Sequence, residues 1–484
     1  MGANDAYETV IGLEVHVELA TKSKIFCACS TEFGAEPNTQ TCPVCTGMPG
    51  ALPVLNRRVL EHAIAVGLAL HCEIAQYSRF DRKNYFYPDN PQNYQISQLY
   101  LPICRNGYVE IEVQNRTKRI GIHEMHMEED AGKLIHDETN ARTLIDYNRS
   151  GVPLLEIVSE PDMRTAEEVI AYLDNLRLMI QYLGAGDCKL QEGSMRVDVN
   201  LSVRKPGEAL GTRTEMKNLG SFRAVRRAIE AESARQIALL ASGETVRQET
   251  RRWDEGKNQS FSMRSKEDAD DYRYFPDPDL LPIVVSRELI EQIRATQPEL
   301  RNGKMERYRT EYAIPEYDIG IITGSKALAD LFEKTIALGA EPKQVSNWIM
   351  GETLRLLKKN LLDPEELVFS PFHLKELIAM VEEKSVNLSS AKLIFEEMFE
   401  NDIDPRKCAE ERGLLIQRDD GLLRRTIEEV LQNNEKSVAD YKNGKDRAFG
   451  FLVGQTMKAM KGKADPAVVN RMLSECLEKW INCT

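Results

Sequence analysis

The spacing of apolar residues changes once along this chain of 484 residues, near residue 293. Before that point, short β-type runs such as GYVEIEVQN and SMRVDVNLSVR alternate with helical stretches. After it, the sequence is made of amphipathic segments such as LADLFEKTIAL and FHLKELIAMVEEK, separated by breaks that contain proline. A period of two residues predicts strands, and a period near 3.6 predicts helices. The chain is therefore predicted to contain an α+β part followed by an all-α part.

The length of the chain predicts several domains, because 484 residues exceed what a single hydrophobic core supports. We predict three domains: an α+β domain over 1–292, an all-α domain over 293–408 and an all-α tail over 409–484. Ser221 is a typical N-cap residue, so one helix of the first domain is expected to begin after it and to turn Val225 towards the core.

Overall charge and hydropathy exclude some classes of protein. The chain has 63 basic and 76 acidic residues, a formal charge of −13, which argues against non-specific coating of nucleic acid but allows a local basic site. The apolar run AIAVGLAL is far shorter than the ~20 residues that span a bilayer. The N-terminus has the pattern of neither a signal peptide nor a transit peptide. We expect a cytoplasmic protein without a membrane segment.

Four of the ten cysteines are crowded into one short stretch, as C-x-C and, twelve residues later, C-x-x-C. A disulfide framework would distribute its cysteines more widely. Two close pairs on tight turns can instead form a tetrahedral thiolate site, and four sulfur ligands leave no coordination position for substrate. The stretch predicts a structural zinc ion, with a reduced, metal-free loop as the alternative; its ligands would be Cys27, Cys29, Cys42 and Cys45.

Near the N-terminus, ETVIGLEVHVEL alternates apolar and polar residues, which places Glu14 and His16 on one face of a predicted strand. That face could simply be solvated. A second polar cluster, HEMHMEEDAGK, could contribute either Glu128 or Glu129, depending on register. Carboxylates with one imidazole suit Mg²⁺ better than Zn²⁺, and Mg²⁺ suggests a nucleotide. Further carboxylates that could take part are Glu156, Glu160, Asp162, Glu192, Asp198 and Glu215.

No glycine-rich phosphate loop of the two common kinds occurs in the chain. The segment RFDRKNYFYPDNPQNYQISQ instead places Arg82 and Lys83 beside three aromatic residues, and DYRYFPDPD has a similar composition. Both segments are equally well explained as surface loops with buried aromatic side chains, so spacing alone does not decide between a phosphate site and a structural loop.

Together, these stretches resemble one family, the B subunit of the bacterial glutamyl-/aspartyl-tRNA amidotransferase. The resemblance runs in family order almost from end to end. Its segments are IGLEVHVEL, CPVCTGMPGALPVLN, DRKNYFYPDNPQNYQISQ, HMEEDAGK, DYNRSGVPLLEIVSEPD, EGSMRVDVN, RTEMKNLGSFRAVRRAIEAE, DYRYFPDPDLLPI and GFLVGQTMKAMKGKADP. It implies a cradle domain related to glutamine synthetase, followed by a helical domain and a tail domain.

The resemblance also implies an activity in two steps. ATP phosphorylates the side-chain carboxylate of glutamate or aspartate misacylated on tRNA(Gln) or tRNA(Asn), and ammonia then displaces the phosphate. Ammonia would come from a glutaminase A subunit, and a small C subunit would complete a heterotrimer. The implied cofactors are ATP and Mg²⁺. Two alternatives to this activity stay open. The chain could be a non-catalytic tRNA-binding scaffold with a structural metal, or a metal-dependent hydrolase that needs no ATP.

The implied site residues come from the matching segments. Those carried over as catalytic are Glu14, His16, Lys83, Glu128, Glu129, Glu156, Asp198 and Glu215. Magnesium would be held by Glu14, His16 and either Glu128 or Glu129, and the nucleotide by Arg82 and Lys83.

The tail contains a basic segment at 443–463, with five basic residues and one acidic residue. On charge alone it could be an ordinary solvated helix face. The resemblance implies that this region binds tRNA, through Lys458, Lys461 and Lys463.

Overall fold

The computed structural model describes residues 6–137, 139–265, 272–416, 420–460 and 464–483. The chain divides into two compact units, Met1–Arg301 and Asn302–Thr484. The first contains a large β-sheet and the second is helical, as the change in apolar spacing predicts. The first unit continues beyond the expected boundary at 292, because helix α4 (Arg287–Ala295) packs on helix α1 (Arg57–Ala69).

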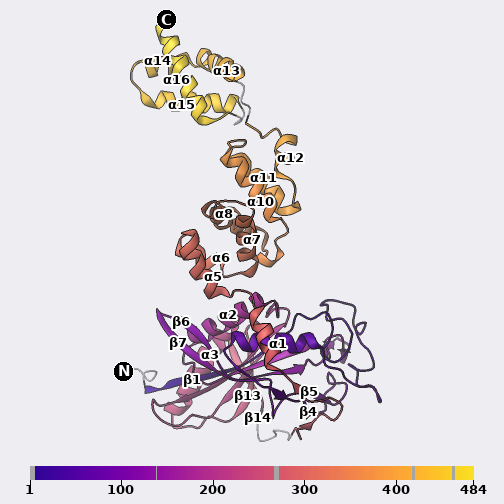
Figure 1. The fold of residues 1–484 in the computed structure, drawn as a ribbon. Helices are drawn as coiled ribbons and strands as arrows, with labels where there is room; N and C mark the ends of the chain where they lie inside the picture. Colours follow the sequence, from indigo (N-terminus) through magenta and orange to yellow (C-terminus); the bar gives the residue numbers. More distant parts are fainter. Residues whose placement is uncertain (1–5, 138, 266–271, 417–419, 461–463, 484) are drawn as a thin grey trace. The chain divides into compact units, whose positions relative to one another are not determined.

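A nine-stranded sheet is the centre of the first unit (Figure 1). Neighbouring strands are antiparallel, except that β12 and β13 are parallel. The strands in spatial order are β14 (Gln259–Ser265), β13 (Glu249–Asp254), β12 (Thr214–Lys217), β11 (Met195–Arg204), β1 (Glu8–Glu18), β10 (Pro153–Ser159), β7 (Arg116–Glu129), β6 (Cys104–Val113) and β2 (Glu73–Ile74).

Helices α1, α2 (Ala166–Leu183) and α3 (Phe222–Ala241) pack on the sheet around one hydrophobic core. On β1, Val15 and Val17 are completely buried in this core, whereas His16 between them is only partly buried. Ser221 caps helix α3, because its side chain accepts a hydrogen bond from the N–H of Ala224 at 3.0 Å. The predicted strand with alternating burial and the predicted helix after Ser221 are therefore both present in the structure.

Smaller sheets complete the first unit. Strands β4 (Asp81–Asn84), β5 (Tyr94–Ser97) and β15 (Phe275–Pro276) form one of them. It is fixed to the end of β7, because Nε2 of Gln95 donates to the carbonyl of Glu129 at 2.7 Å. The other two pair β3 (Tyr77–Ser78) with β16 (Ile283–Val284), and β8 (Lys133–Asp137) with β9 (Arg142–Asp146).

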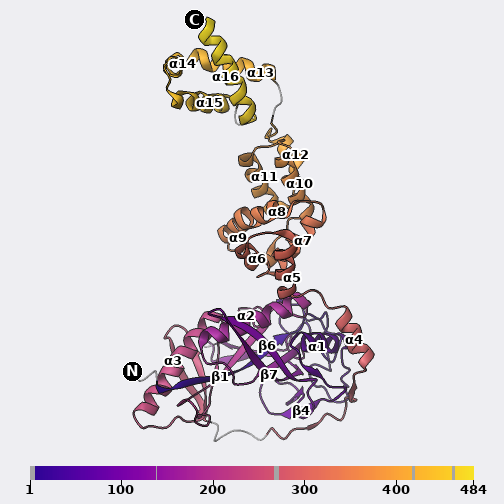
Figure 2. The ribbon, with the colours of Figure 1, turned by 60° about the vertical axis from the view of Figure 1, so that its left-hand side comes forward.

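Helices alone make up the regular structure that Figure 2 draws for the described residues of the second unit. Their buried side chains form two separate hydrophobic cores, one within 308–409 and one within 423–477. Among the described residues, no helix combines the length and the apolar character that crossing a membrane requires. The helices are α5 (Arg301–Arg307), α6 (Glu316–Ile322), α7 (Lys326–Ala337), α8 (Pro342–Trp348), α9 (Leu354–Asn360), α10 (Pro371–Glu382), α11 (Leu388–Asn401), α12 (Pro405–Glu411), α13 (Asp420–Asn433), α14 (Glu435–Lys442), α15 (Asp446–Ala459) and α16 (Pro466–Cys483).

Candidate active site and metal centres

Charged side chains cross four neighbouring strands on the polar face of the large sheet. His126 on β7 lies opposite Glu156 on β10, Glu156 lies opposite His16 on β1, and His16 lies opposite Arg196 on β11. Directly opposed residues of antiparallel strands have their side chains on the same face, within reach of one another. The register therefore brings residues that are far apart in the sequence into one row.

His16, Glu128 and Glu156 form a cluster that we call the histidine–glutamate group. Nε2 of His16 lies 3.6 Å from Glu128 and 3.4 Å from Glu156. A ligand atom from each of the three residues lies within 4.8 Å of the others. His126 borders the group, with its Nε2 3.2 Å from Glu156. The arrangement suits a divalent cation that prefers oxygen ligands.

The charge balance of this group depends on His16 and on the bordering His126. Burial alone would lower the pKa of His16, but the hydrogen bond with Glu156 and the charges of Glu156 and Glu128 raise it. The pKa of His126 is also raised, because Glu156, Glu124 and Glu128 outweigh burial. The neighbouring carboxylates therefore favour the protonated form of both histidines.

Glu14, Asp198 and Glu215 form a second cluster, the three-carboxylate group, whose ligand atoms also lie within 4.8 Å of one another. Burial, followed by the charge of Glu156 and of the other two carboxylates, raises the pKa of Glu14. Lys217 is the cation beside this group: it bonds to Asp198, and its Nζ lies 3.1 Å from Glu215. Three converging carboxylates fit a hard divalent cation.

Lys83 on β4 is a cation whose pKa depends on two carboxylates of the histidine–glutamate group. Although burial opposes it, the charge of Glu128, followed by those of Tyr274 and Glu156, raises the pKa of Lys83. Its Nζ lies 5.0 Å from the ring centre of Tyr272. A partly buried, charged lysine at the edge of an acidic site can donate hydrogen bonds to a phosphate oxygen.

Arg82, the neighbour of Lys83 in the sequence, has different partners. It donates to Asp277 and Asp279, both at 2.7 Å, and its guanidinium lies 4.1 Å from the ring centre of Tyr94. These contacts connect β4 to the segment after β15, as expected of a residue that stabilises the loop structure. The structure does not bring Arg82 to the two carboxylate-containing groups, and nucleotide binding by Arg82 stays a prediction.

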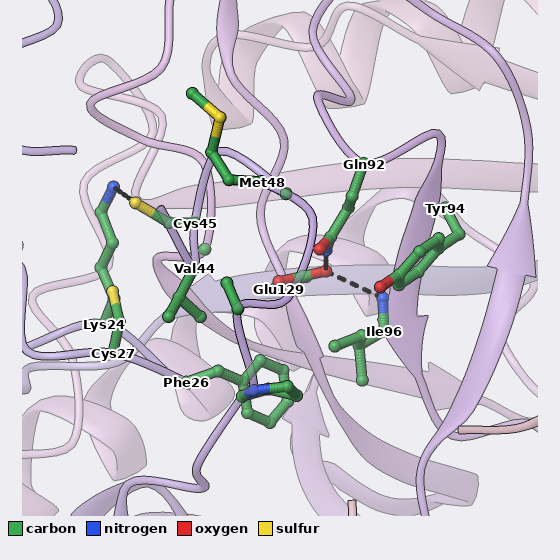
Figure 3. Close-up of a pocket in the computed structure, with 14 residues that line it drawn as sticks. Lys24, Phe26, Cys27, Val44, Cys45, Met48, Gln92, Tyr94, Ile96 and Glu129 are labelled. Carbon is green, nitrogen blue, oxygen red and sulfur yellow. Dashed lines mark hydrogen bonds between the residues drawn. The ribbon is translucent and has the colours of Figure 1, made fainter. Parts of the chain in front are cut away.

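Glu129 points away from both groups, because consecutive strand residues face opposite sides. Its carboxylate accepts hydrogen bonds from Nε2 of Gln92 and from the N–H of Ile96, the latter at 3.0 Å (Figure 3). It lines a cavity of about 50 Å³ together with Cys27 and Cys45. Of the two glutamates that the sequence leaves as alternatives, Glu128 is the one beside His16.

The burial of Glu129 has a consequence for stability. Burial raises its pKa to about 8 from an ordinary value of 4.5, so ionisation progressively destabilises the fold as pH rises through that interval. Glu129→Gln removes this charge, so the variant should be stabilised relative to the wild type more at pH 8 than at pH 5. The difference in free energy of unfolding between variant and wild type should be larger at pH 8 by about 3 kcal/mol. Urea unfolding at both pH values measures this difference. The exposed Glu112→Gln on β6 is the control, and an equal effect of Glu129→Gln at both pH values would contradict this prediction.

The cysteine cluster has the geometry of a metal site. Atoms Sγ of Cys27, Cys29, Cys42 and Cys45 lie within 4.8 Å of one another. The Sγ atoms of Cys42 and Cys45 are 3.9 Å apart, close to the ~3.8 Å separation of two thiolates on one tetrahedral Zn²⁺. The buried Lys24 places its Nζ 3.5 Å from Sγ of Cys45, as Figure 3 shows. Its positive charge offsets part of the thiolate charge, and the four residues fit a zinc ion.

We expect elemental analysis of the chain, purified without chelator, to find about one zinc per molecule. Cys45→Ser should lose most of that zinc and lower the thermal unfolding temperature, because the loop then loses its cross-link. Cys476→Ser is the matched control, since Cys476 lies outside the cluster. A zinc-free wild type, or an unchanged zinc content in Cys45→Ser, would refute a zinc site at these cysteines.

Sequence patterns left three charged residues of the sheet face without an assigned role. His126 and Lys217 each lie two positions from a predicted site residue, so alternation along a strand could have identified them. Arg196 lies two positions before Asp198 and gives the same signal, but its place opposite His16 follows only from the pairing of β1 with β11. In the tail, Lys458 is exposed on α15, whereas Lys461 and Lys463 lie outside the described residues.

The fold and the site define a protein with a catalytic α+β part and a helical part. A family model described as the GatB/GatE catalytic domain matches residues 9–291, and a GatB domain model matches residues 330–477. The chain belongs to the GatB family of tRNA amidotransferase subunits. The B subunit of the aspartyl/glutamyl-tRNA(Asn/Gln) amidotransferase of Agathobacter rectalis is 65% identical over 97% of this chain and 99% of its own length. The proteins of the same name from Lachnoclostridium phytofermentans and Caldicellulosiruptor saccharolyticus are 63% and 58% identical, each over 98% of this chain and 99% of its own length.

Proposed function

We propose that this chain amidates glutamate or aspartate misacylated on tRNA(Gln) or tRNA(Asn), in an ATP-dependent complex with a glutaminase A subunit and a small C subunit. The observation that carries the proposal is the pair of adjacent acidic groups on one sheet face, with Lys83 beside one and Lys217 beside the other. The names of the relatives support the substrate class.

The reaction needs no protein nucleophile. In the first step, an oxygen of the substrate carboxylate attacks the γ-phosphorus of ATP and forms an acyl phosphate, while ADP leaves. In the second step, ammonia attacks the acyl carbon, phosphate leaves and a proton is lost, which gives the amide. Both steps depend on the positioning of anions and on neutralisation of developing charge.

The residues of this chain are suited to those tasks. The histidine–glutamate group and the three-carboxylate group would each hold one divalent cation, and bound Mg²⁺ would supply neutralisation of phosphate oxygens. Lys83 and Lys217 would bind anionic oxygens from the flanks of the site. The zinc ion would stabilise the loop that lines the cavity beside Glu129. The relation of the first domain to glutamine synthetase, and tRNA binding by the tail, belong to the same proposal.

The decisive test is an amidation assay with the assembled subunits, ATP, Mg²⁺, glutamine and each misacylated tRNA. Amidated tRNA that forms only when ATP is present supports the proposal. Binding of misacylated tRNA without ATP consumption would indicate a scaffold, and hydrolysis of the aminoacyl-tRNA without ATP would indicate a metal-dependent hydrolase.

A further inference from the structure

One ion pair ties together strands that are not neighbours in the sheet. Asp130 directly follows β7, Arg196 lies on β11, and β10 and β1 run between them. Nη1 and Nη2 of Arg196 donate to the two carboxylate oxygens of Asp130, at 2.8 and 3.0 Å. Such a two-pronged contact fixes the orientation of both side chains as well as their distance.

Asp130 also holds the turn by which the chain leaves β7. Its side chain accepts a hydrogen bond from the N–H of Ala131 at 2.8 Å, and Nε of Arg149 lies 3.4 Å from it. Arg149 in turn donates to the carbonyls of Ala131 and Gly132, both at 3.0 Å. Asp130 is only 6% exposed, so removing its partners would leave a buried charge without compensation.

The same ion pair borders the histidine–glutamate group on two sides. Glu128 lies two residues before Asp130, whose N–H still bonds to the carbonyl of Val152 at 2.8 Å, so the pairing with the β10 segment continues past the end of β7. Both side chains therefore leave the backbone in the same direction. Arg196 lies directly opposite His16. A shift of the turn after β7 would therefore displace the carboxylate of Glu128 relative to His16 and Glu156.

We propose that Asp130 and Arg196 are positioning residues, whose ion pair fixes Glu128 in the geometry in which it binds a divalent cation with His16 and Glu156. The proposal rests on the proposed function, in which that group holds Mg²⁺. Residues that orient metal ligands from outside typically change metal affinity by 10–100-fold when they are replaced.

Arg204 offers a matched control on the same strand and the same face of the sheet. It donates to Glu8 on β1 at 2.6 Å, so Arg204→Ala also removes an ion pair that involves β11. The two arginines are eight positions apart along the strand, which corresponds to about 26 Å. A purely structural role predicts a loss of thermal stability in both variants, whereas positioning predicts weaker metal binding only when Arg196 is replaced.

The test is a titration of the zinc-loaded full-length chain with Mn²⁺, followed by the electron paramagnetic resonance signal of the free ion. Arg196→Ala and Asp130→Asn are expected to weaken one Mn²⁺ site by about 10–100-fold, and Arg196→Lys, which keeps the charge but not the two-pronged contact, by less. Arg204→Ala should bind Mn²⁺ as the wild type does. Glu128→Gln combined with Arg196→Ala should bind no more weakly than Glu128→Gln alone, because the ion pair acts through Glu128.

Wild-type Mn²⁺ affinity in folded Arg196→Ala would overturn the proposal, and so would an equal loss in Arg204→Ala. If Arg196→Ala does not fold, Asp130→Asn and Arg196→Lys decide by the same criteria. A wild type that binds Mn²⁺ but forms no amidated tRNA in the assembled complex would refute the proposed function alone, and the titration would still decide the role of the ion pair. A wild type that binds no Mn²⁺ would refute both.

Discussion

Glu128→Gln is expected to lower tRNA-dependent ATP consumption of the assembled complex by about 10³-fold. In the proposed function Glu128 helps to hold a divalent cation, whose charge stabilises the transition state by several kcal/mol, and each 1.4 kcal/mol that is lost lowers the rate tenfold. The substitution removes one negative charge from a group in which Nε2 of His16 lies 3.6 Å from Glu128. Glutamine has nearly the same shape, so packing is preserved while the affinity for a divalent cation falls.

The measurement is the steady-state rate of ADP formation with saturating misacylated tRNA, together with the affinity for that tRNA. The affinity should stay within about twofold of the wild type, because the lost charge acts on phosphoryl transfer. Glu160→Gln is the control for the same chemical change at a partly exposed position next to β10. A wild-type rate in Glu128→Gln would show that the histidine–glutamate group does not take part in the reaction.

The positions of Glu14 and His16 show how much of this site could be predicted from the sequence. Alternation along β1 correctly placed both residues on the polar face of the sheet. It could not show that they belong to two different groups, because that depends on the strands at either side of β1. On one side β10 brings Glu156 to His16, and on the other β11 brings Asp198 to Glu14.

The choice between Glu128 and Glu129 was undecidable from sequence for a similar reason. Both are nearly fully buried, so hydrophobic patterning does not distinguish them. The difference between them comes from neighbouring strands. The pairing of β7 with β10 places Glu128 beside Glu156, and β5 at the end of β7 provides the hydrogen bond to Glu129. The contacts of Arg82 could not be predicted either, because its aspartate partners lie almost two hundred residues away in the sequence.

The cysteine cluster, in contrast, was predictable because its signal is local. Its two pairs lie on tight turns with a short loop between them, so spacing alone restricts the positions of the sulfur atoms. The boundary of the helical part was less predictable. Helix α4 has the amphipathic pattern of the segments that follow it, yet its apolar side packs on the core of the first unit.

Truncation after Ile416 is expected to raise the KM for misacylated tRNA by at least about tenfold, because in the proposed function the tail supplies phosphate contacts and no chemistry. The tRNA-independent glutaminase activity of the complex should stay unchanged. The position matters, since α12 contributes the buried Cys408 and Ala409 to the core within 308–409. Truncation at Ile416 retains those residues and removes the separate core within 423–477.

A point substitution tests the same idea without removing a domain. Lys458 is exposed on α15, so Lys458→Glu should weaken tRNA binding without disturbing the core of the tail. The slope of log affinity against log salt concentration should decrease by about one for each phosphate interaction that the substitution removes. Lys359→Glu, at a position on α9 that is also exposed, should leave the slope unaltered. If affinity and slope in Lys458→Glu and in the truncated chain match those of the wild type, the basic face of the tail is solvated surface and tRNA must be bound by residues before 417.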